Sequence, residues 1–454
     1  MSDQPPPVPE SPAPESPAPR SSLLRRAFTP AGSGEQGEGP SSPQQRKRAF
    51  QILFLSLICL GVGQSGMFAI LPPVSRDLGL TEFQTGAIFA ISATIWVFSS
   101  AYWGARSDRQ GRRPMIVLGL AAFSVSMFAF ATSVEIGLMG LLPIAVVYPL
   151  MIVSRSIYGI FGSAGFPAAQ GYIADRTSPS ERTNAVATLN AAFGLGTTAG
   201  PGIIAALAVM GTIAPLYFIA AVGAVSAFSI WRFLPERTAP VMQQKDKSQK
   251  LSWRDGRILP FLIFGVLLGT AGSFPIQVIA YFFMDVLKLD TNQAIQMSGV
   301  GLMASSMAAL FAQLVIVQRM QMTAGQLVQW GIGIGFASYV LFIVGETYGL
   351  IVFALLLSGL GFGLIRPGYA AAVSLAVGKE QQGAAAGLTG GATASGFIFA
   401  PLIGNWLYAY DAHYPFYLGA AMMIVMAIYV AVTPRLRTLD AEAEDNAETN
   451  VPKV

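Results

Sequence analysis

The sequence predicts an all-α membrane protein of twelve transmembrane helices, arranged as two six-helix bundles. Of its 454 residues 53% are apolar and only 11% are charged, whereas soluble domains usually carry about 25% charged residues. After residue 49, apolar runs recur that reach the roughly 20 residues a helix needs to cross a bilayer. The longest polar interruption, from Glu236 to Arg257, divides these runs six and six.

The apolar runs set the expected bounds of the helices. We place the spans near residues 50–72, 83–104, 114–132, 146–174, 183–209 and 213–234, and then near 259–284, 293–318, 325–344, 348–377, 382–408 and 414–434. Runs such as Ala121 to Phe128 and Ile351 to Leu357 lack the alternation of period two that is typical of membrane β-strands. The spans are therefore expected to be helices.

The polar segments complete the expected division of the chain. Residues 1–45 form a tract rich in Pro, Ser and Glu, too polar for a core, with no apolar stretch like that of a secretory signal peptide. We expect a disordered tail that serves as a spacer, with a docking segment as the alternative. The first bundle should span 46–235, a linker 236–257, the second bundle 258–436 and a tail 437–454.

Lysine and arginine gather in alternate loops, which predicts the orientation. Basic residues precede the first span and follow every even-numbered span, whereas the other loops hold little beyond Arg76 and Lys288. The positive-inside rule therefore places both termini in the cytoplasm. We expect a plasma-membrane protein, in the inner membrane if the source is bacterial. Basic loops beside an anionic leaflet account for the net charge of +4 without a nucleic-acid partner.

The chemistry available to the chain argues against an enzyme. Cys59 is the only cysteine, so no disulfide within the chain and no thiol metal site is possible, and His413 is the only histidine. No P-loop, metal constellation or nucleophile with a nearby base occurs. We therefore expect neither catalysis nor a cofactor, ATP and metals included.

An internal repeat supports the division into halves. At an offset of 200 residues four Gly or Pro pairs coincide: Gly159 with Gly359, Pro167 with Pro367, Gly196 with Gly396, and Pro201 with Pro401. Duplicated bundles related by an axis along the membrane normal produce this kind of repeat.

The loop after the second span carries the most specific motif. It contains Gly104, Asp108, Arg109, Gly111, Arg112 and Arg113 and resembles the signature Gly-x-Leu-x-Asp-Arg-x-Gly-Arg-Arg of the major facilitator superfamily, except that Arg106 replaces the Leu. Gly104 permits close helix approach, Gly111 supplies a turn, and Asp108 can cap a helix N-terminus. The resemblance implies that the helix capped by Asp108 is the eleventh, which should start near Gln382, and that this contact is a latch that joins the two halves in the outward-facing state. It also implies that Arg112 pairs with Asp175. Basic loops alone would explain the arginines but not Asp108.

The fourth span carries Arg155, Tyr158 and Gly159, and is followed by Asp175 and Arg182. This pattern resembles an Arg-x-x-x-Gly element which, in the drug:proton antiporters of that superfamily, implies a part for Arg155 in proton coupling. At about 1.5 Å per residue, Arg155 should lie about 30 Å from Asp175, toward the external end. The alternative is an arginine that snorkels to the external interface.

The fifth span contains Gly196, Gly200 and Pro201, which resemble the Gly-x-x-x-Gly-Pro element of the antiporter branch and imply export. Glycines four residues apart let another helix approach closely, and Pro201 should bend the helix. Ordinary helix packing is the competing interpretation of the glycines.

The resemblance also implies a central cavity lined by the first, fourth, seventh and tenth helices. The polar residues expected to bind substrate there are Gln64, Tyr158, Gln277, Tyr281, Arg366 and Tyr369. Arg366 precedes Pro367 and has no acid in its own helix to pair with. Because an uncompensated buried cation is costly, Arg366 should meet water, a distant carboxylate or a bound anion. Each glutamine could instead merely bond a neighbouring helix.

No Asp or Glu lies in the middle of any span, which lowers the expectation of a cationic cargo. We therefore expect an exporter of a neutral or anionic small molecule, either a drug-like compound or a secreted metabolite. It should work as a monomer by alternating access, in exchange for protons. Two alternatives remain: proton-coupled uptake of an organic anion, and a non-transporting sensor or scaffold that docks through its tail.

Overall fold

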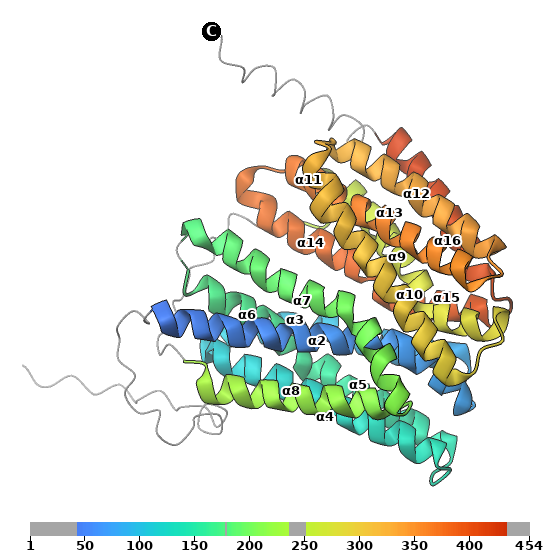
Figure 1. Cartoon of the computed structure of the whole chain (residues 1–454). Coiled ribbons are helices and arrows are strands. Elements are labelled where there is room, and N and C mark those ends of the chain that lie inside the picture. The colour runs from blue at the N-terminus through green and yellow to red at the C-terminus, as the bar shows by residue number, and fades with distance from the viewer. Residues whose placement is uncertain (1–42, 178, 236–250, 434–454) are drawn as a thin grey trace, which may run out of the picture.

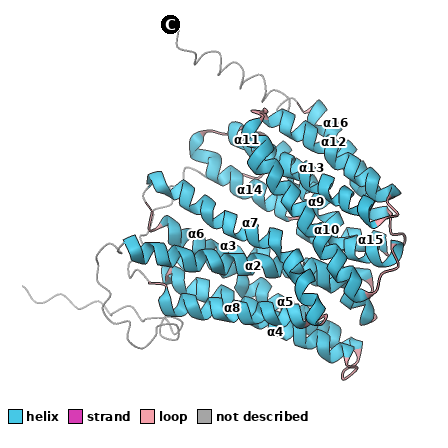
Figure 2. Cartoon of the chain, in the orientation of Figure 1, coloured by secondary structure: helices cyan, strands magenta, loops and turns pink. Residues whose placement is uncertain are grey.

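The computed structural model describes residues 43–177, 179–235 and 251–433. Within them, twelve helices are long and apolar enough to cross a membrane, and Figure 2 shows helices joined by loops with no strand in the described part. The first six spans are built from α2 (Pro43–Asp77), α3 (Glu82–Gln110), α4 (Arg112–Leu138), α5 (Ile144–Phe161) with α6 (Gly165–Ala174), α7 (Pro179–Leu207) and α8 (Ala214–Phe233).

The last six spans follow the same plan. They are built from α9 (Leu259–Val286), α10 (Thr291–Phe311) with α11 (Val317–Arg319), α12 (Ala324–Val344), α13 (Tyr348–Leu375), α14 (Gln382–Ala394) with α15 (Gly396–Tyr408), and α16 (Tyr414–Val432). Short 3₁₀ or π-helical turns, or a single residue, separate the paired segments. The prediction of twelve helices is confirmed.

Three helices end five or six residues beyond their apolar runs. The helix α2 continues through Pro72 and Pro73 to Asp77, α3 continues to Gln110, and α4 continues to Leu138. A proline removes only its own backbone donor and bends a helix without ending it when neighbouring helices support the bend. The two prolines therefore do not mark the end of α2.

The helices form two bundles, α2–α8 and α9–α16, which lie one above the other in Figure 1. We call the side at which α2 begins and α16 ends the termini side, and the other the opposite side. In Figure 1 the bundles diverge toward the termini side, where α7 and α14 lie apart, and come together toward the opposite side.

Glycines of the 200-residue repeat make equivalent helix crossings in the two bundles. A Cβ on Gly159 would meet the Ser92 carbonyl of α3, and one on Gly359 would overlap the Ser305 carbonyl of α10. Gly196 lies in the same way against α2, and Gly396 against α9. Each pair joins corresponding spans, so the repeat in sequence is a repeat in packing.

Gly196 and Gly200 both pack on α2, within the first bundle. Of the element expected to govern gating, only Pro201 reaches the other bundle, where its carbonyl lies against Gly299 of α10. In this conformation the two glycines pack α7 closely against α2, and their part in gating stays a prediction.

Replacing Gly196 with leucine should lower the thermal stability of the purified protein. The added side chain would overlap the Ile58 backbone, and overpacking of this kind costs about 1–3 kcal/mol. Gly194 is the matched control, because a Cβ at that position has nothing within 4 Å. A midpoint of unfolding for Gly196→Leu equal to that of Gly194→Leu would contradict the close α2–α7 contact.

The two bundles meet on the opposite side. There Gly86 of α3 packs against the Pro401 carbonyl of α15, Phe68 stacks on Phe397 with ring centroids 6.2 Å apart, and Gly299 packs against Pro201. On the termini side the corresponding helices are separate: a Cβ on Gly104 of α3, or on any of four glycines of α14, would have open space around it (Gly383, Gly387, Gly390 and Gly391). The structure is therefore closed at the opposite side and open at the termini side.

Candidate transport pathway and gate

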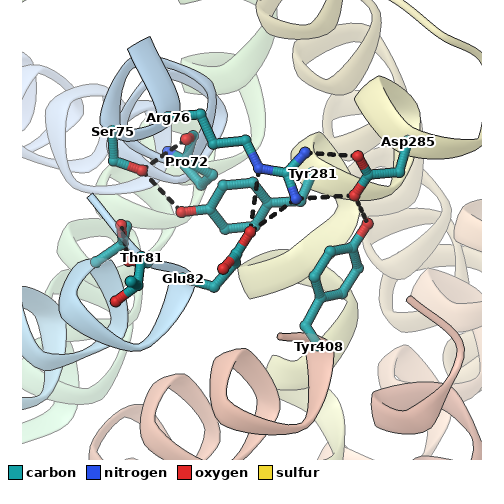
Figure 3. Close-up of polar contacts among 9 residues, drawn as sticks. Pro72, Ser75, Arg76, Thr81, Glu82, Tyr281, Asp285 and Tyr408 are labelled. Atoms are coloured by element: carbon teal, nitrogen blue, oxygen red, sulfur yellow. Dashed lines mark hydrogen bonds and ion pairs between the residues drawn. The ribbon is translucent and has the colours of Figure 1, made fainter. Parts of the chain in front are cut away.

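An ion pair joins the first helices of the two bundles at the opposite side. Arg76, near the end of α2, donates to both carboxylate oxygens of Asp285 at the end of α9, over 2.7 and 2.8 Å. The same guanidinium binds Glu82 of α3, with Nε and Nη2 at 3.1 and 2.8 Å from Oε1 (Figure 3). Two parallel N–H···O bonds fix the orientation of a carboxylate better than one contact does.

Two tyrosines of the second bundle complete this cluster. The Tyr408 hydroxyl of α15 donates to Asp285 Oδ2 over 2.8 Å, and the Tyr281 hydroxyl shares a hydrogen bond of 2.8 Å with Ser75 of α2. The Arg76 guanidinium lies over the Tyr281 ring, 4.7 Å from its centroid, and Figure 3 shows these side chains gathered with Asp285 and Tyr408. We call Arg76, Glu82, Tyr281, Asp285 and Tyr408 the opposite-side lock, since it ties four helices from both bundles.

Two further hydrogen bonds cross between the bundles at this side. Thr291 donates to Asp77 and Thr212 donates to Asn292, each over 2.8 Å. Partly exposed pairs are individually weak, on the order of 0–1 kcal/mol. Several of them together, with the bidentate contact, favour the closed arrangement.

The motif loop on the termini side has the expected turn and one expected ion pair. Gly111 adopts φ 100° between α3 and α4, a backbone conformation that suits glycine. Arg112 Nε lies 3.0 Å from Asp175 Oδ2, which is the predicted pair. Asp108 binds Arg112 over 2.5 Å instead of capping a helix of the second bundle.

The latch on Asp108 was expected for the outward-facing state, and the termini side is open here. Its expected partner, α14, does begin at Gln382. Of the other motif residues, Arg113 is buried and donates to the Trp231 carbonyl of α8, whereas Arg109 and Arg182 are exposed.

Arg155 lies in the interior of the first bundle. Its side chain is 5% exposed, and Nη2 donates to Gln64 Oε1 of α2 over 3.3 Å. The other two guanidinium nitrogens, Nε and Nη1, have no hydrogen-bond partner among the described residues. The snorkelling interpretation is wrong for this structure, because the guanidinium points to α2. The span begins at Ile144, which puts Arg155 three turns inside it and not near its end.

Gln277 of α9 is a second polar group without a partner. Its side chain is 1% exposed, and neither its amide nitrogen nor its amide oxygen has a hydrogen-bond partner among the described residues. At 1.5 Å per residue, Gln64, Arg155 and Gln277 lie roughly 26–29 Å from the termini-side ends of their spans. All three are therefore at a similar depth. Gln64 is one turn from Phe68, where the bundles touch.

Arg366 of α13 is exposed and has no hydrogen bond or ion pair within the described part of the chain. Neighbours on α13 show which way it points: Gly359 and Gly363 pack on α10, whereas Phe362 and Tyr369 pack on α9. Arg366 leaves the helix between these two directions, on the side of the first bundle. It lies roughly 14 Å from the termini-side end of α13.

A family model of the Major Facilitator Superfamily matches residues 53–394 and, in a second match, residues 327–453. The chain belongs to the major facilitator superfamily. It is a multi-pass membrane transporter and not an enzyme.

Curated relatives and solved structures agree with this membership. The chain is 27% identical over 395 residues to Multidrug resistance protein 1 of Bacillus subtilis (strain 168), covering 86% of this chain and 96% of the relative. It is 25% identical over 398 residues to Quinolone resistance protein NorA of Staphylococcus aureus (strain MRSA252), covering 86% and 97%. Structures of the nucleoside transporter NupG (TM-score 0.68, 14% identity, covering 85% and 98%) and of the human organic anion transporter MFSD10 (TM-score 0.59, 17% identity, covering 86% and 100%) share its fold.

Two tyrosines that we expected in the central cavity of this superfamily member lie elsewhere. Tyr281 is fully buried in the opposite-side lock. Tyr369 is buried as well, and its hydroxyl donates to the Phe261 carbonyl of α9 over 2.8 Å. The prediction that these two tyrosines bind substrate is corrected for this structure, because the hydroxyl of each already has a partner within the protein. Tyr158 is also buried, with its ring 5.4 Å from the Arg155 guanidinium.

The pairing in the lock escaped the sequence analysis. Arg76 and Asp285 were visible as charges at the ends of their spans, but a single chain does not say which ends meet. One signal could have found the pair: Arg76 ends the first span of one bundle and Asp285 ends the first span of the other. In a duplicated fold such helices occupy corresponding positions.

Proposed function

We propose that this transporter exports a small neutral or anionic organic molecule across the plasma membrane, in exchange for protons. It would work as a monomer by alternating access, with residues 46–235 and 258–436 moving as two units; most of the predicted linker 236–257 lies outside the described residues. The positive-inside pattern supports a cytoplasmic termini side. The open state described above would then face the cytoplasm, ready to take up cargo.

The observation that carries the cargo class is the pair of arginines without acid partners. Arg155 is buried in the first bundle, Arg366 lies within a span of the second bundle with its side chain exposed, and neither forms an ion pair with a described carboxylate. A cation inside the membrane is costly unless it meets water or an anion. A cargo with a carboxylate or enolate would gain from either arginine, whereas a lipophilic cation would be repelled.

The proposed direction of transport and its coupling to protons rest on other observations. Two relatives are named for resistance to drugs, which favours export, and Arg155 matches the element that the family resemblance links to proton coupling. Because no carboxylate lies mid-span, the proton would travel on an acid at a span end or on the cargo itself. Uptake of an organic anion is the second candidate, since Arg366 would serve either direction.

Transport in inverted membrane vesicles tests the proposal. Respiration acidifies the lumen, so an exporter in proton exchange should accumulate an aromatic carboxylate and its neutral amide there, and an uncoupler should abolish this. A quaternary ammonium analogue should not accumulate. Accumulation no greater than in vesicles without the protein, or a preference for the ammonium compound, would overturn the proposal. Accumulation in whole cells with external alkalinisation would favour uptake.

A further inference from the structure

A cavity of about 960 Å³ opens on the termini side between the starts of α2 and α7 and the end of α6. It is separate from the interior arginines. Its lining is Lys47, Phe50, Gln51, Phe54, Leu55, Arg176, Thr177, Glu181, Asn184, Ala185 and Thr188. The volume is at the upper end of the roughly 300–1,000 Å³ that small-molecule sites enclose. Figure 1 shows α6 behind the diverging ends of α2 and α7.

The lining changes from charged to apolar with depth in the membrane. Lys47 begins the first span, whereas Phe54 and Leu55 lie roughly 11–12 Å further along α2. The charged residues Arg176 and Glu181 lie at the same end, beside the loop between the fourth and fifth spans. The cavity therefore has a polar mouth at the membrane interface and an apolar floor in the hydrocarbon region.

The apolar part of the cavity faces the lipid. Leu55 is 65% exposed, whereas Leu53 and Leu57, on the other face of α2, are 1% and 4% exposed. A side chain midway between two core residues of a helix points away from the core. Leu55 therefore lies on the outer surface, where an acyl chain can reach it.

The charge at the mouth is positive. Arg176 is 9% exposed, stacks on Tyr172 and donates to the Pro235 carbonyl, which fixes its position. Lys47 is exposed and has no hydrogen bond or ion pair within the described residues. With Glu181 counted, the three charged lining residues sum to +1, which complements one phosphodiester.

We propose that this cavity binds one anionic phospholipid of the termini-side leaflet. Its phosphate lies at Lys47 and Arg176, and an acyl chain follows Phe54 and Leu55 along α2. The lipid bridges α2 and the α6–α7 pair within the first bundle. The proposal rests on the membrane location and not on the proposed cargo, so the vesicle assay can fail without affecting it.

Titration of the purified full-length protein with phosphatidylglycerol, followed by native mass spectrometry and thermal unfolding, tests the site. Phosphatidylglycerol should bind and raise the midpoint of unfolding, whereas phosphatidylcholine should bind more weakly. Lys47→Gln should weaken phosphatidylglycerol binding about fivefold, the worth of one basic residue near an anionic surface. Arg48→Gln is the matched control, because Arg48 lies over the Phe233 ring and does not line the cavity.

A second pair of variants tests the acyl chain. Leu55→Trp should fill the floor and abolish phosphatidylglycerol binding, whereas Val225→Trp, also exposed but on α8 outside the cavity, should not. Glycerol 1-phosphate, the headgroup phosphate without chains, should give no stabilisation. Equal effects of Lys47→Gln and Arg48→Gln, or equal binding of both lipids, would overturn the proposal. Stabilisation by glycerol 1-phosphate that survives Leu55→Trp would instead identify a site for free anions.

Discussion

Replacing Asp285 with asparagine should open the opposite side of the transporter. The change removes the charge that holds both guanidinium nitrogens of Arg76 and accepts from Tyr408. Allowing for the partial exposure of this pair, its loss should cost about 1–2 kcal/mol, which changes the ratio of the two states roughly 5- to 30-fold. Tyr408→Phe should shift the ratio in the same direction by less.

Spin labels can measure this shift, because Cys59 is the only native cysteine. In a Cys59→Ser background, labels at Leu141 and Tyr410 report the distance between exposed loops of the two bundles on the opposite side. Asp285→Asn should increase the population at longer distances. Asp411→Asn is the control, since Asp411 contacts His413 in its own loop. Identical distance distributions for Asp285→Asn and the parent would refute the lock.

The pair itself can be isolated with a double-mutant cycle. Arg76→Gln and Asp285→Asn should each shift the equilibrium, and the double variant should shift it by less than the sum. Additive shifts would mean that the two residues act independently, against the contact described here. Exchanging the two charges, with an acid at position 76 and a base at position 285, would be less informative. Glu82 lies beside position 76 and would repel an acid there.

Replacing Arg366 with alanine should remove the preference for anions. If a carboxylate binds this unpaired guanidinium, loss of the guanidinium should weaken binding of the anion about tenfold, since a hydrogen bond to a charged group is worth about 1.5 kcal/mol or more. Binding of the matched neutral amide should change little. Arg366→Lys should recover only part of the affinity, because an ammonium cannot make the bidentate contact.

Thermal-shift titration with anionic, neutral and cationic compounds measures this effect. Arg319→Ala provides the control: Arg319 ends α11 on the same side of the membrane, outside the interior of the bundle. Stabilisation by the carboxylate that is unchanged in Arg366→Ala would exclude Arg366 as the anchor. Loss of stabilisation by all three compounds would also contradict a charge-specific role.

The sequence predicted the fold because the patterns that define it can be recognised without knowing which helices touch. Apolar runs located the spans, the linker divided them, and the glycines at an offset of 200 residues predicted equivalent packing. Errors arose where a position depends on other helices. Pro72 and Pro73 ended the apolar run of α2 but not its helix, and Arg155 bonds Gln64 of α2 rather than reaching the external interface.

The candidate site was predicted less completely, for the same physical reason. Arg366 and Gln277 stood out because polar groups in a span need partners, and these two still have none among the described residues. The lock was missed, since Arg76 and Asp285 are 209 positions apart and only the assembled bundles bring them together. The partner of Asp108 depends on the conformational state, which a sequence does not specify.

The bare face of α14 has an energetic meaning. A glycine in a helix costs about 0.5–1 kcal/mol relative to alanine, and four glycines of α14 receive no contact in return here, since nothing lies within 4 Å of their would-be Cβ atoms. That cost is incurred when α14 forms and is the same in every state in which the segment stays helical. An arrangement in which another backbone packs against this face would therefore add contacts without a further cost from the glycines.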